Sequence, residues 1–178
     1  MEEKSYFKQF DIGFQSMKIG QHFQDLKITN EFFEMYENDV VTDANIDIHI
    51  DIERLENMVI MHFHFSGTLT STCDLCLEKV IIPVEKTEKL ILKIVEAPQE
   101  SDDENIFYVT EKEHTFNVEQ ITYEYIMMSL PMKIEHSNEG EDRCNPKMLE
   151  LLRQAEKKPE TTEIDSRWEA LKSLKLDS

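Results

Sequence analysis

The stretch "ANIDIHIDIERLENMVIMHFHFSGTLT", residues 44–70, alternates apolar with polar residues at the period of two that is typical of β-strands. A hairpin that turns at Glu56 and Asn57 brings the apolar side chains of both arms to one face. The pairs that this register predicts are Ile52 with Met61, Ile50 with Phe63, and Ile48 with Phe65. The sequence therefore predicts a long antiparallel hairpin with one core face and one wet face. Because Glu-Asn is not a favoured two-residue turn, we expect a looser connection.

Further strands are predicted on both sides of this hairpin. The expected strands cover residues 5–12, 16–29, 79–95, 106–110 and 114–118, with a short helical turn at 30–38 and an acidic loop at 96–106. The segment 79–95 fits one strand or a pair, and Pro83 is expected to interrupt it, as at an edge or a bulge. Most of the chain before the first long helix is therefore predicted to be sheet.

Two helices are predicted after this sheet. Asn117 and Gln120 resemble a capping box, and the helix that they open ends before Pro131. Asn145 and Pro146 open the second helix. The apolar residues at helical spacing are Val118, Ile121, Tyr125 and Met128 in the first helix, and Met148, Leu151, Leu152 and Ala155 in the second. Together these elements predict an α+β fold, a predominantly antiparallel β-sheet with a packed C-terminal helix pair.

The last residues differ in character from the rest. We expect a single α+β domain over residues 1–156, a polar linker over 157–164, and an amphipathic tail with a short helix over 165–178. Trp168, Leu171 and Leu174 lie on one side of that tail, which is the pattern of a short helix that docks on a partner. The alternative, docking on its own domain, stays open because a polar linker permits both.

The composition restricts the function. Nineteen Lys and Arg against thirty-seven Asp and Glu give a formal charge of −18, which opposes nonspecific attraction to nucleic-acid phosphates or anionic membranes. The stretch "MEEKSYFKQF", residues 1–10, lacks the positive start and apolar run of a signal peptide, and no later segment approaches the ~20 apolar residues of a membrane span, so we expect a soluble, cytoplasmic protein without a membrane partner. With four glycines, no phosphate loop and no nucleophile elbow, we expect that the protein is not an enzyme.

The three cysteines suggest a metal site. Cys73 and Cys76 form a Cys-x2-Cys pair, and His136 and Cys144 form a second pair with seven residues between them, so that the four can close a tetrahedral Cys3His set. Sulfur with imidazole favours zinc over magnesium or calcium. Buried or free thiols remain an alternative, and so does redox chemistry, although a redox Cys-x2-Cys normally opens a helix and this one leads into a strand.

The predicted hairpin also gathers polar groups on its wet face. His49 falls opposite His64, and Asp51 falls opposite His62, so these groups could bind a metal or move a proton. We favour a solvated or partner-facing surface, because an open sheet face has no pocket that excludes water. A metal-dependent enzyme that uses these histidines stays as an alternative.

Three stretches in order, "FSGTLTSTCDLCLEKVIIPV", "YEYIMMSLPMKIEHSNEGEDRC" and "RWEALKSL", resemble the YceD family of large ribosomal RNA subunit accumulation proteins. The resemblance covers residues 15–174 and includes the positions of Cys73, Cys76, His136 and Cys144. It implies a cytoplasmic, non-catalytic factor that is needed for accumulation or processing of large-subunit ribosomal RNA. Many relatives have Arg where this chain has Leu75, which argues against contact between this turn and RNA phosphate.

The negative charge refines what the resemblance implies. We expect the protein to act through a basic ribosomal protein or a large-subunit precursor particle, with weak binding to naked RNA. The alternative is a zinc-stabilised protein-interaction module unrelated to ribosomes.

Overall fold

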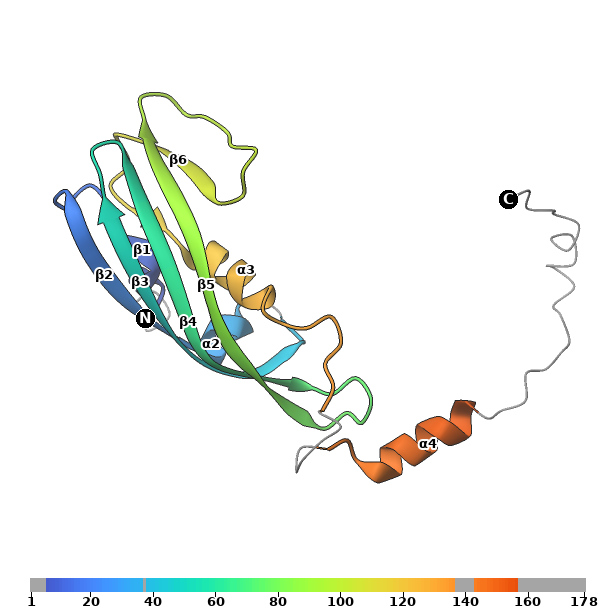
Figure 1. Cartoon of the computed structure of the whole chain (residues 1–178). Coiled ribbons are helices and arrows are strands. Elements are labelled where there is room, and N and C mark those ends of the chain that lie inside the picture. Colours follow the sequence, from blue (N-terminus) through green and yellow to red (C-terminus); the bar gives the residue numbers. More distant parts are fainter. Residues whose placement is uncertain (1–5, 37, 137–142, 157–178) are drawn as a thin grey trace, which may run out of the picture.

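The structure is a computed structural model that describes residues 6–36, 38–136 and 143–156. Its main feature is a five-stranded sheet with the order β2-β3-β4-β5-β6, whose long strands bend together (Figure 1). The bounds of the strands are Gly20–Thr29 for β2, Val41–Arg54 for β3, Met58–Thr72 for β4, Lys79–Val95 for β5 and Ile106–Thr110 for β6. Neighbouring strands are antiparallel from β2 to β5, and β6 runs parallel to β5.

Shorter elements cover one face of this sheet (Figure 1). They are the 3-10 helix η1 (Phe7–Phe10), the paired strands β1 (Asp11–Ile12) and β7 (Phe116–Asn117), and the helices α2 (Asn30–Glu34) and α3 (Glu119–Met127). Phe10, Phe32 and Tyr125 of these elements are buried in one core with the apolar side chains of the sheet. The polar residues of β3 lie exposed on the other face. The α+β class and the mainly antiparallel sheet are thus confirmed.

The predicted register of the hairpin is confirmed. Ile52 pairs with Met61, Ile50 with Phe63 and Ile48 with Phe65. The expectation of a loose turn was wrong, because the Leu55 amide donates to the Met58 carbonyl at 2.9 Å and leaves only Glu56 and Asn57 between them.

Two other strand predictions were wrong. Residues 7–10 form η1 instead of a strand, and only Asp11 and Ile12 of that segment pair with another strand. Pro83 does not interrupt β5, which continues from Lys79 to Val95 and places Pro83 opposite Thr68 without a shift of register. The expectation that Pro83 lies at an edge is nevertheless confirmed, because β6 pairs only with residues from Ile91 onward and the nitrogen of Pro83 faces an edge where no ladder bond is lost.

The first predicted helix is found and the packing of the second is not confirmed. In α3, Ile121, Tyr125 and Ile126 are buried, whereas Met128 follows the last helical residue and is 62% exposed, so its assignment to the packed face was wrong. Helix α4 (Pro146–Glu156) begins as predicted, with Asn145 Oδ1 accepting from the Lys147 amide at 3.0 Å, but none of its residues is buried. It points away from the sheet in Figure 1.

The linker and tail predictions concern residues 157–178, which lie outside the described residues. Within the described part of the chain, no helix has the length and apolar character needed to cross a membrane.

Candidate metal centre

The Cys-x2-Cys pair lies in the tight connection between β4 and β5. The Cys73 amide donates to the Glu78 carbonyl at 2.8 Å, and the Leu77 amide donates to the Cys73 carbonyl at 3.0 Å. Leu77 has a φ of 62°, a left-handed conformation that allows the chain to reverse after Cys76. These bonds hold both thiols inside the protein, where Cys73 and Cys76 are buried.

The segment after α3 is fastened to this connection by a reciprocal pair of bonds. The Asp74 amide donates to the Ile134 carbonyl at 2.8 Å, and Asp74 Oδ2 accepts from the Ile134 amide at 2.7 Å. Further along, Asn145 Nδ2 donates to Glu78 Oε1 at 2.7 Å. These contacts bring His136 and Cys144 to the cysteine pair. None of these fastening residues was predicted, because a lone Asp or Asn in a loop has no periodicity that reveals its partner.

The four side chains meet with the spacing of a tetrahedral site. Their ligand atoms all lie within 4.8 Å of one another, with the Sγ atoms of Cys73 and Cys144 3.7 Å apart and Cys76 Sγ 3.4 Å from His136 Nδ1. Zinc bonds of about 2.3 Å to sulfur and about 2.0 Å to nitrogen give tetrahedral edges of about 3.8 and about 3.6 Å. The 3.7 and 3.4 Å separations are close to these edges, and the sulfur–sulfur distance far exceeds the ~2.05 Å of a disulfide.

His136 presents the nitrogen that a metal needs. Its Nε2 lies 3.0 Å from the Lys79 carbonyl, which can only accept, so Nε2 carries the proton and Nδ1 keeps a lone pair. That Nδ1 faces the sulfurs of Cys76 and Cys144, at 3.4 and 3.8 Å. Histidines that bind a metal commonly donate their other ring N–H to a backbone carbonyl in this way, which fixes the tautomer.

The Cys73 and Cys144 thiols differ strongly in pKa. Burial raises the pKa of the Cys73 thiol, but the backbone N–H groups of Cys76, Leu75 and His136 outweigh it and lower this pKa to about 6. Burial and the hydrogen bonds to Cys73 and Cys76 raise the pKa of Cys144 to about 11. The negative charge of one thiolate therefore disfavours ionisation of the neighbouring thiol. A divalent cation between the sulfurs would offset this repulsion.

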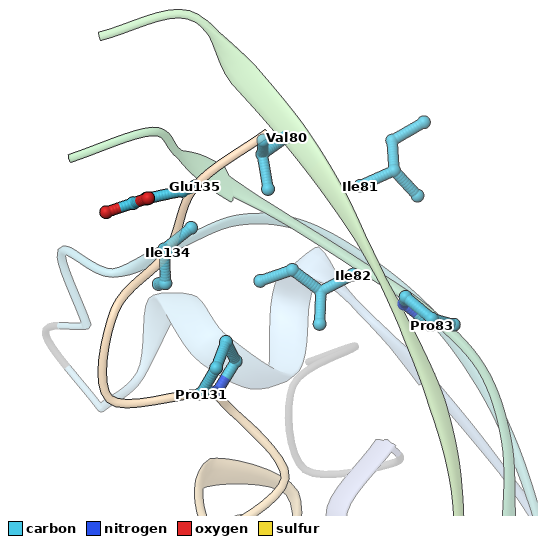
Figure 2. A pocket seen from close by; sticks show the side chains of 7 residues that line it. All are labelled: Val80, Ile81, Ile82, Pro83, Pro131, Ile134 and Glu135. Atoms are coloured by element: carbon cyan, nitrogen blue, oxygen red, sulfur yellow. The ribbon is translucent and has the colours of Figure 1, made fainter. Parts of the chain in front are cut away.

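The fastened segment also leaves a small apolar hollow beside β5 (Figure 2). Its volume is about 240 Å³, and in Figure 2 Ile82 points toward Pro131 and Ile134 whereas Ile81 points away. No ionisable group other than Glu135 lines it, and Glu135 is ion-paired with Lys133. This hollow has no constellation of catalytic groups among its lining residues.

The predicted partners on the wet face of the hairpin are confirmed, with His49 opposite His64 and Asp51 opposite His62. His49 Nδ1 lies 2.6 Å from Asp25 Oδ1, and this bond is the main reason why the pKa of His49 is raised. His64 Nε2 lies 3.0 Å from Asp51 Oδ2. A hollow of about 390 Å³ borders the two histidines, so the face is less flat than the sequence suggested.

The other predicted site residues, Trp168, Leu171 and Leu174, lie outside the described ranges. Leu75, between the cysteines, is half-buried against the core.

A curved sheet with helices on one face and a Cys3His cluster at one end defines an α+β protein with a candidate structural metal centre. The family model "Large ribosomal RNA subunit accumulation protein YceD" matches residues 61–175, a range that includes all four clustered residues. The chain therefore belongs to the YceD family, which confirms the resemblance seen in the sequence. No curated protein and no solved structure matches the chain.

Proposed function

We propose that the protein is a non-catalytic ribosome-assembly factor that promotes the accumulation or processing of large-subunit ribosomal RNA. The observation that carries this proposal is the family match over residues 61–175. It acts in the cytoplasm and binds a basic ribosomal protein or a precursor of the large subunit, because a chain of formal charge −18 is repelled by bare RNA and attracted by basic proteins.

The outer face of the sheet supports a partner of this kind. Asp51 lies opposite Phe23 there, Asp25 lies two residues along the same strand, and both are exposed beside the exposed ring of Phe23, which stacks on His49 with the ring centres 5.8 Å apart. An aromatic side chain amid carboxylates suits a basic protein surface, with Phe23 as the apolar anchor.

A non-catalytic role fits the chemistry of the histidines. His49 is bonded to Asp25 and His64 to Asp51, and both imidazoles are about half exposed. Each histidine is thus paired with an aspartate on an open face of the sheet. Such a face suits the binding of a partner better than proton transfer, which is favoured in a site that excludes water.

The Cys3His cluster is a structural zinc site in this proposal. Cys73, Cys76, His136 and Cys144 supply the ligand set, and the metal would link the β4–β5 connection to the segment before α4. Soft sulfur ligands with one neutral imidazole and tetrahedral spacing are the coordination that zinc takes in closed structural sites. All four positions are taken up by protein ligands, which leaves none for substrate.

The ribosomal role is tested by comparing two binding measurements. Tagged protein from growing cells is purified with its partners, identified by mass spectrometry, and the purified protein is titrated with naked large-subunit RNA in a mobility-shift assay. We expect ribosomal proteins or precursor particles in the first measurement and weak binding in the second. Tight, salt-sensitive binding to naked RNA contradicts the proposed route.

The zinc site is tested by elemental analysis of protein purified under reducing conditions. We expect one zinc per chain, and loss of that zinc together with a lower melting temperature in Cys144→Ser, whose half-buried position makes the side-chain change itself mild. Thr72→Ser, an exposed change beside the same connection, serves as the control and keeps the metal. Metal-free wild-type protein that melts at the same temperature as Cys144→Ser leaves only the buried-thiol interpretation.

A zinc-stabilised interaction module unrelated to ribosomes is the second candidate, and the Cys3His cluster favours it. It predicts bound zinc without any cosedimentation with ribosomal particles.

The predicted tail is tested by truncation after Lys158, which is expected to leave the domain folded and to weaken partner binding through loss of Trp168. Unchanged partner binding would leave docking on its own domain as the role of the tail.

A further inference from the structure

Three histidines and an aspartate form a compact group on the outer face of the sheet. His62 and His64 are two residues apart in β4, so both imidazoles leave the strand on the same side. His49 of β3 lies directly opposite His64, and Asp51 lies directly opposite His62. Opposite residues of paired strands have Cβ atoms about 5 Å apart, and residues two apart on one strand are about 7 Å apart. The four side chains can therefore reach one point above the sheet.

Three members of this group already meet. His64 Nε2 lies 3.0 Å from Asp51 Oδ2, and His49 Nε2 lies 3.4 Å from Asp51 Oδ1. Metal bonds of about 2.1 Å to nitrogen and oxygen give tetrahedral edges of about 3.4 Å, so these two distances are close to those between neighbouring ligands. The fourth member, His62, lies half-buried beside them.

The other ring nitrogen of each of these two imidazoles is held from behind. His49 Nδ1 lies 2.6 Å from Asp25 Oδ1, which can only accept, so this Nδ1 carries a proton. His64 Nδ1 lies 3.2 Å from Thr87 Oγ1. A carboxylate behind a histidine orients the ring and makes the opposite nitrogen more basic, and this arrangement is common at metal sites. Both rings thus present Nε2 to the same carboxylate.

The contact between His49 and Asp51 is favourable only with a cation. Because the Nδ1 proton of His49 is donated to Asp25, a neutral imidazole has only a lone pair on Nε2, and that lone pair faces Asp51 Oδ1. Two lone pairs repel each other unless a proton or a metal ion lies between them. A proton on Nε2 serves this one contact, whereas a divalent ion serves the carboxylate and all the imidazoles at once.

The surroundings suit a cation as well. Asp25 and Asp47 border the same hollow as the two histidines, and Lys27 is already paired with Asp47 at 2.6 Å. Lys89, opposite His62, is exposed and can turn into water. The hollow, of about 390 Å³, leaves room for water beside a bound ion.

We propose that His49, Asp51, His62 and His64 bind a divalent transition-metal ion on the outer face of the sheet. Imidazoles with one carboxylate suit ions such as zinc, copper or nickel, whereas magnesium and calcium take oxygen ligands. Within the described residues, only the Cys3His cluster has its ligand atoms already gathered, so the outer-face imidazoles turn inward when the ion binds. About half of each of the His49 and His64 side chains is exposed, which leaves this rotation open.

This outer-face site is separate from the Cys3His cluster. Strand β4 continues for eight residues from His64 to Thr72, which is about 26 Å of extended chain, before it reaches Cys73. The two sites therefore share no ligand. The outer-face site is also independent of the ribosomal role proposed above.

The test is a zinc titration of reduced protein that carries no affinity tag and is already loaded at the Cys3His cluster. Calorimetry at neutral pH, in a buffer that does not bind metal, is expected to show one further and weaker equivalent of zinc. His49→Gln, His62→Gln and His64→Gln are each expected to weaken this second binding about tenfold or more. His114→Gln, an exposed histidine outside the strands, is the matched control and is expected to keep it.

The carboxylate behind His49 gives a second measurement. Asp25→Asn leaves all four ligands in place and is expected to weaken the second zinc about tenfold. Asp102→Asn, in the exposed acidic loop, removes the same charge and is expected to change nothing. Equal affinities in these two variants would contradict the contact of Asp25 with the site.

Nuclear magnetic resonance locates the ion. The ring-proton signals of His49, His62 and His64 are expected to shift during the second equivalent, while those of His114 stay unchanged. A wild-type protein that takes up no zinc beyond the Cys3His cluster overturns the proposal. So does a second equivalent that any of the three histidine variants binds with wild-type affinity, because the assigned ligand set would then be wrong. Circular dichroism confirms that every variant is folded.

Discussion

Among the glycines that the structure describes, Gly67 is the one where an added methyl group should harm the fold most. It lies in β4, opposite Ile46 of β3 and Val84 of β5, with a φ of +157°. A Cβ on this residue would lie 2.2 Å from the Asn45 carbonyl oxygen and 2.7 Å from Ile46 Cα. Both are backbone atoms of a paired strand, so they cannot move aside as a flexible side chain could.

We therefore expect Gly67→Ala to lower the free energy of unfolding by about 2 to 6 kcal/mol. A backbone conformation reserved for glycine accounts for about 1 to 3 kcal/mol, and displacement of packed atoms adds about 1 to 3 kcal/mol. With a denaturant slope of about 2 kcal/mol per M, the urea midpoint should fall by about 2 M.

Gly20→Ala is the matched control. Gly20 also has a positive φ, +132°, but a Cβ there would meet nothing within 4 Å. It should show only the backbone cost of about 1 to 3 kcal/mol. If Gly67→Ala loses no more stability than Gly20→Ala in urea melts followed by circular dichroism, contact with β3 is not what requires glycine, and the reasoning fails. If the difference is found, it gives a physical reason for the glycine in "FSGTLTSTCDLCLEKVIIPV", one of the stretches that carry the family resemblance.

Three further predictions concern the turn and the outer face. Leu77→Gly should raise the free energy of unfolding by about 0.5 kcal/mol, because it relieves a left-handed leucine, whereas Leu77→Val should lower it by about 1 kcal/mol; equal melts would contradict this. Asp74→Ala should weaken zinc binding about 10-fold or more in a competition titration with a chelator, because the segment that carries His136 loses its fastening; an unchanged affinity would show that this fastening is not needed. The pKa of His49 should be above 6.5 by NMR and should fall in Asp25→Asn, so the stabilisation from this pair is full below pH 6.5 and is lost as the pH rises through the raised pKa; a pKa that ignores the substitution would refute the pairing.

The parts of the fold that follow from a repeating pattern could be predicted from the sequence. The period of two between residues 44 and 70 determines which side chains are buried, and a shift of one residue would expose all of them, so the register of β3 and β4 was predictable. The 3-10 helix at residues 7–10 was not, since a short apolar segment fits a helical turn as well as a strand. Its conformation depends on packing against α2, which local sequence does not reveal.

The metal centre, too, could be predicted from the sequence only in part. The four candidate ligands could be proposed because cysteine and histidine are few and their spacing is characteristic, and the structure does bring them together. The contacts that assemble them, from Asp74 to Ile134 and from Asn145 to Glu78, could not be proposed. Each joins residues about sixty or more positions apart in the sequence through groups that are common in any loop.

The long separation between the two halves of the Cys3His cluster also bears on the order of folding. Strands β2 to β5 pair with their neighbours in sequence, whereas Cys73 and Cys144 are 71 residues apart, so their contact closes a longer loop at a higher entropic cost. The cluster should therefore close after the rate-limiting step. In that case bound metal would leave the folding rate nearly unchanged and slow unfolding, so that the ion sets how long each molecule stays folded.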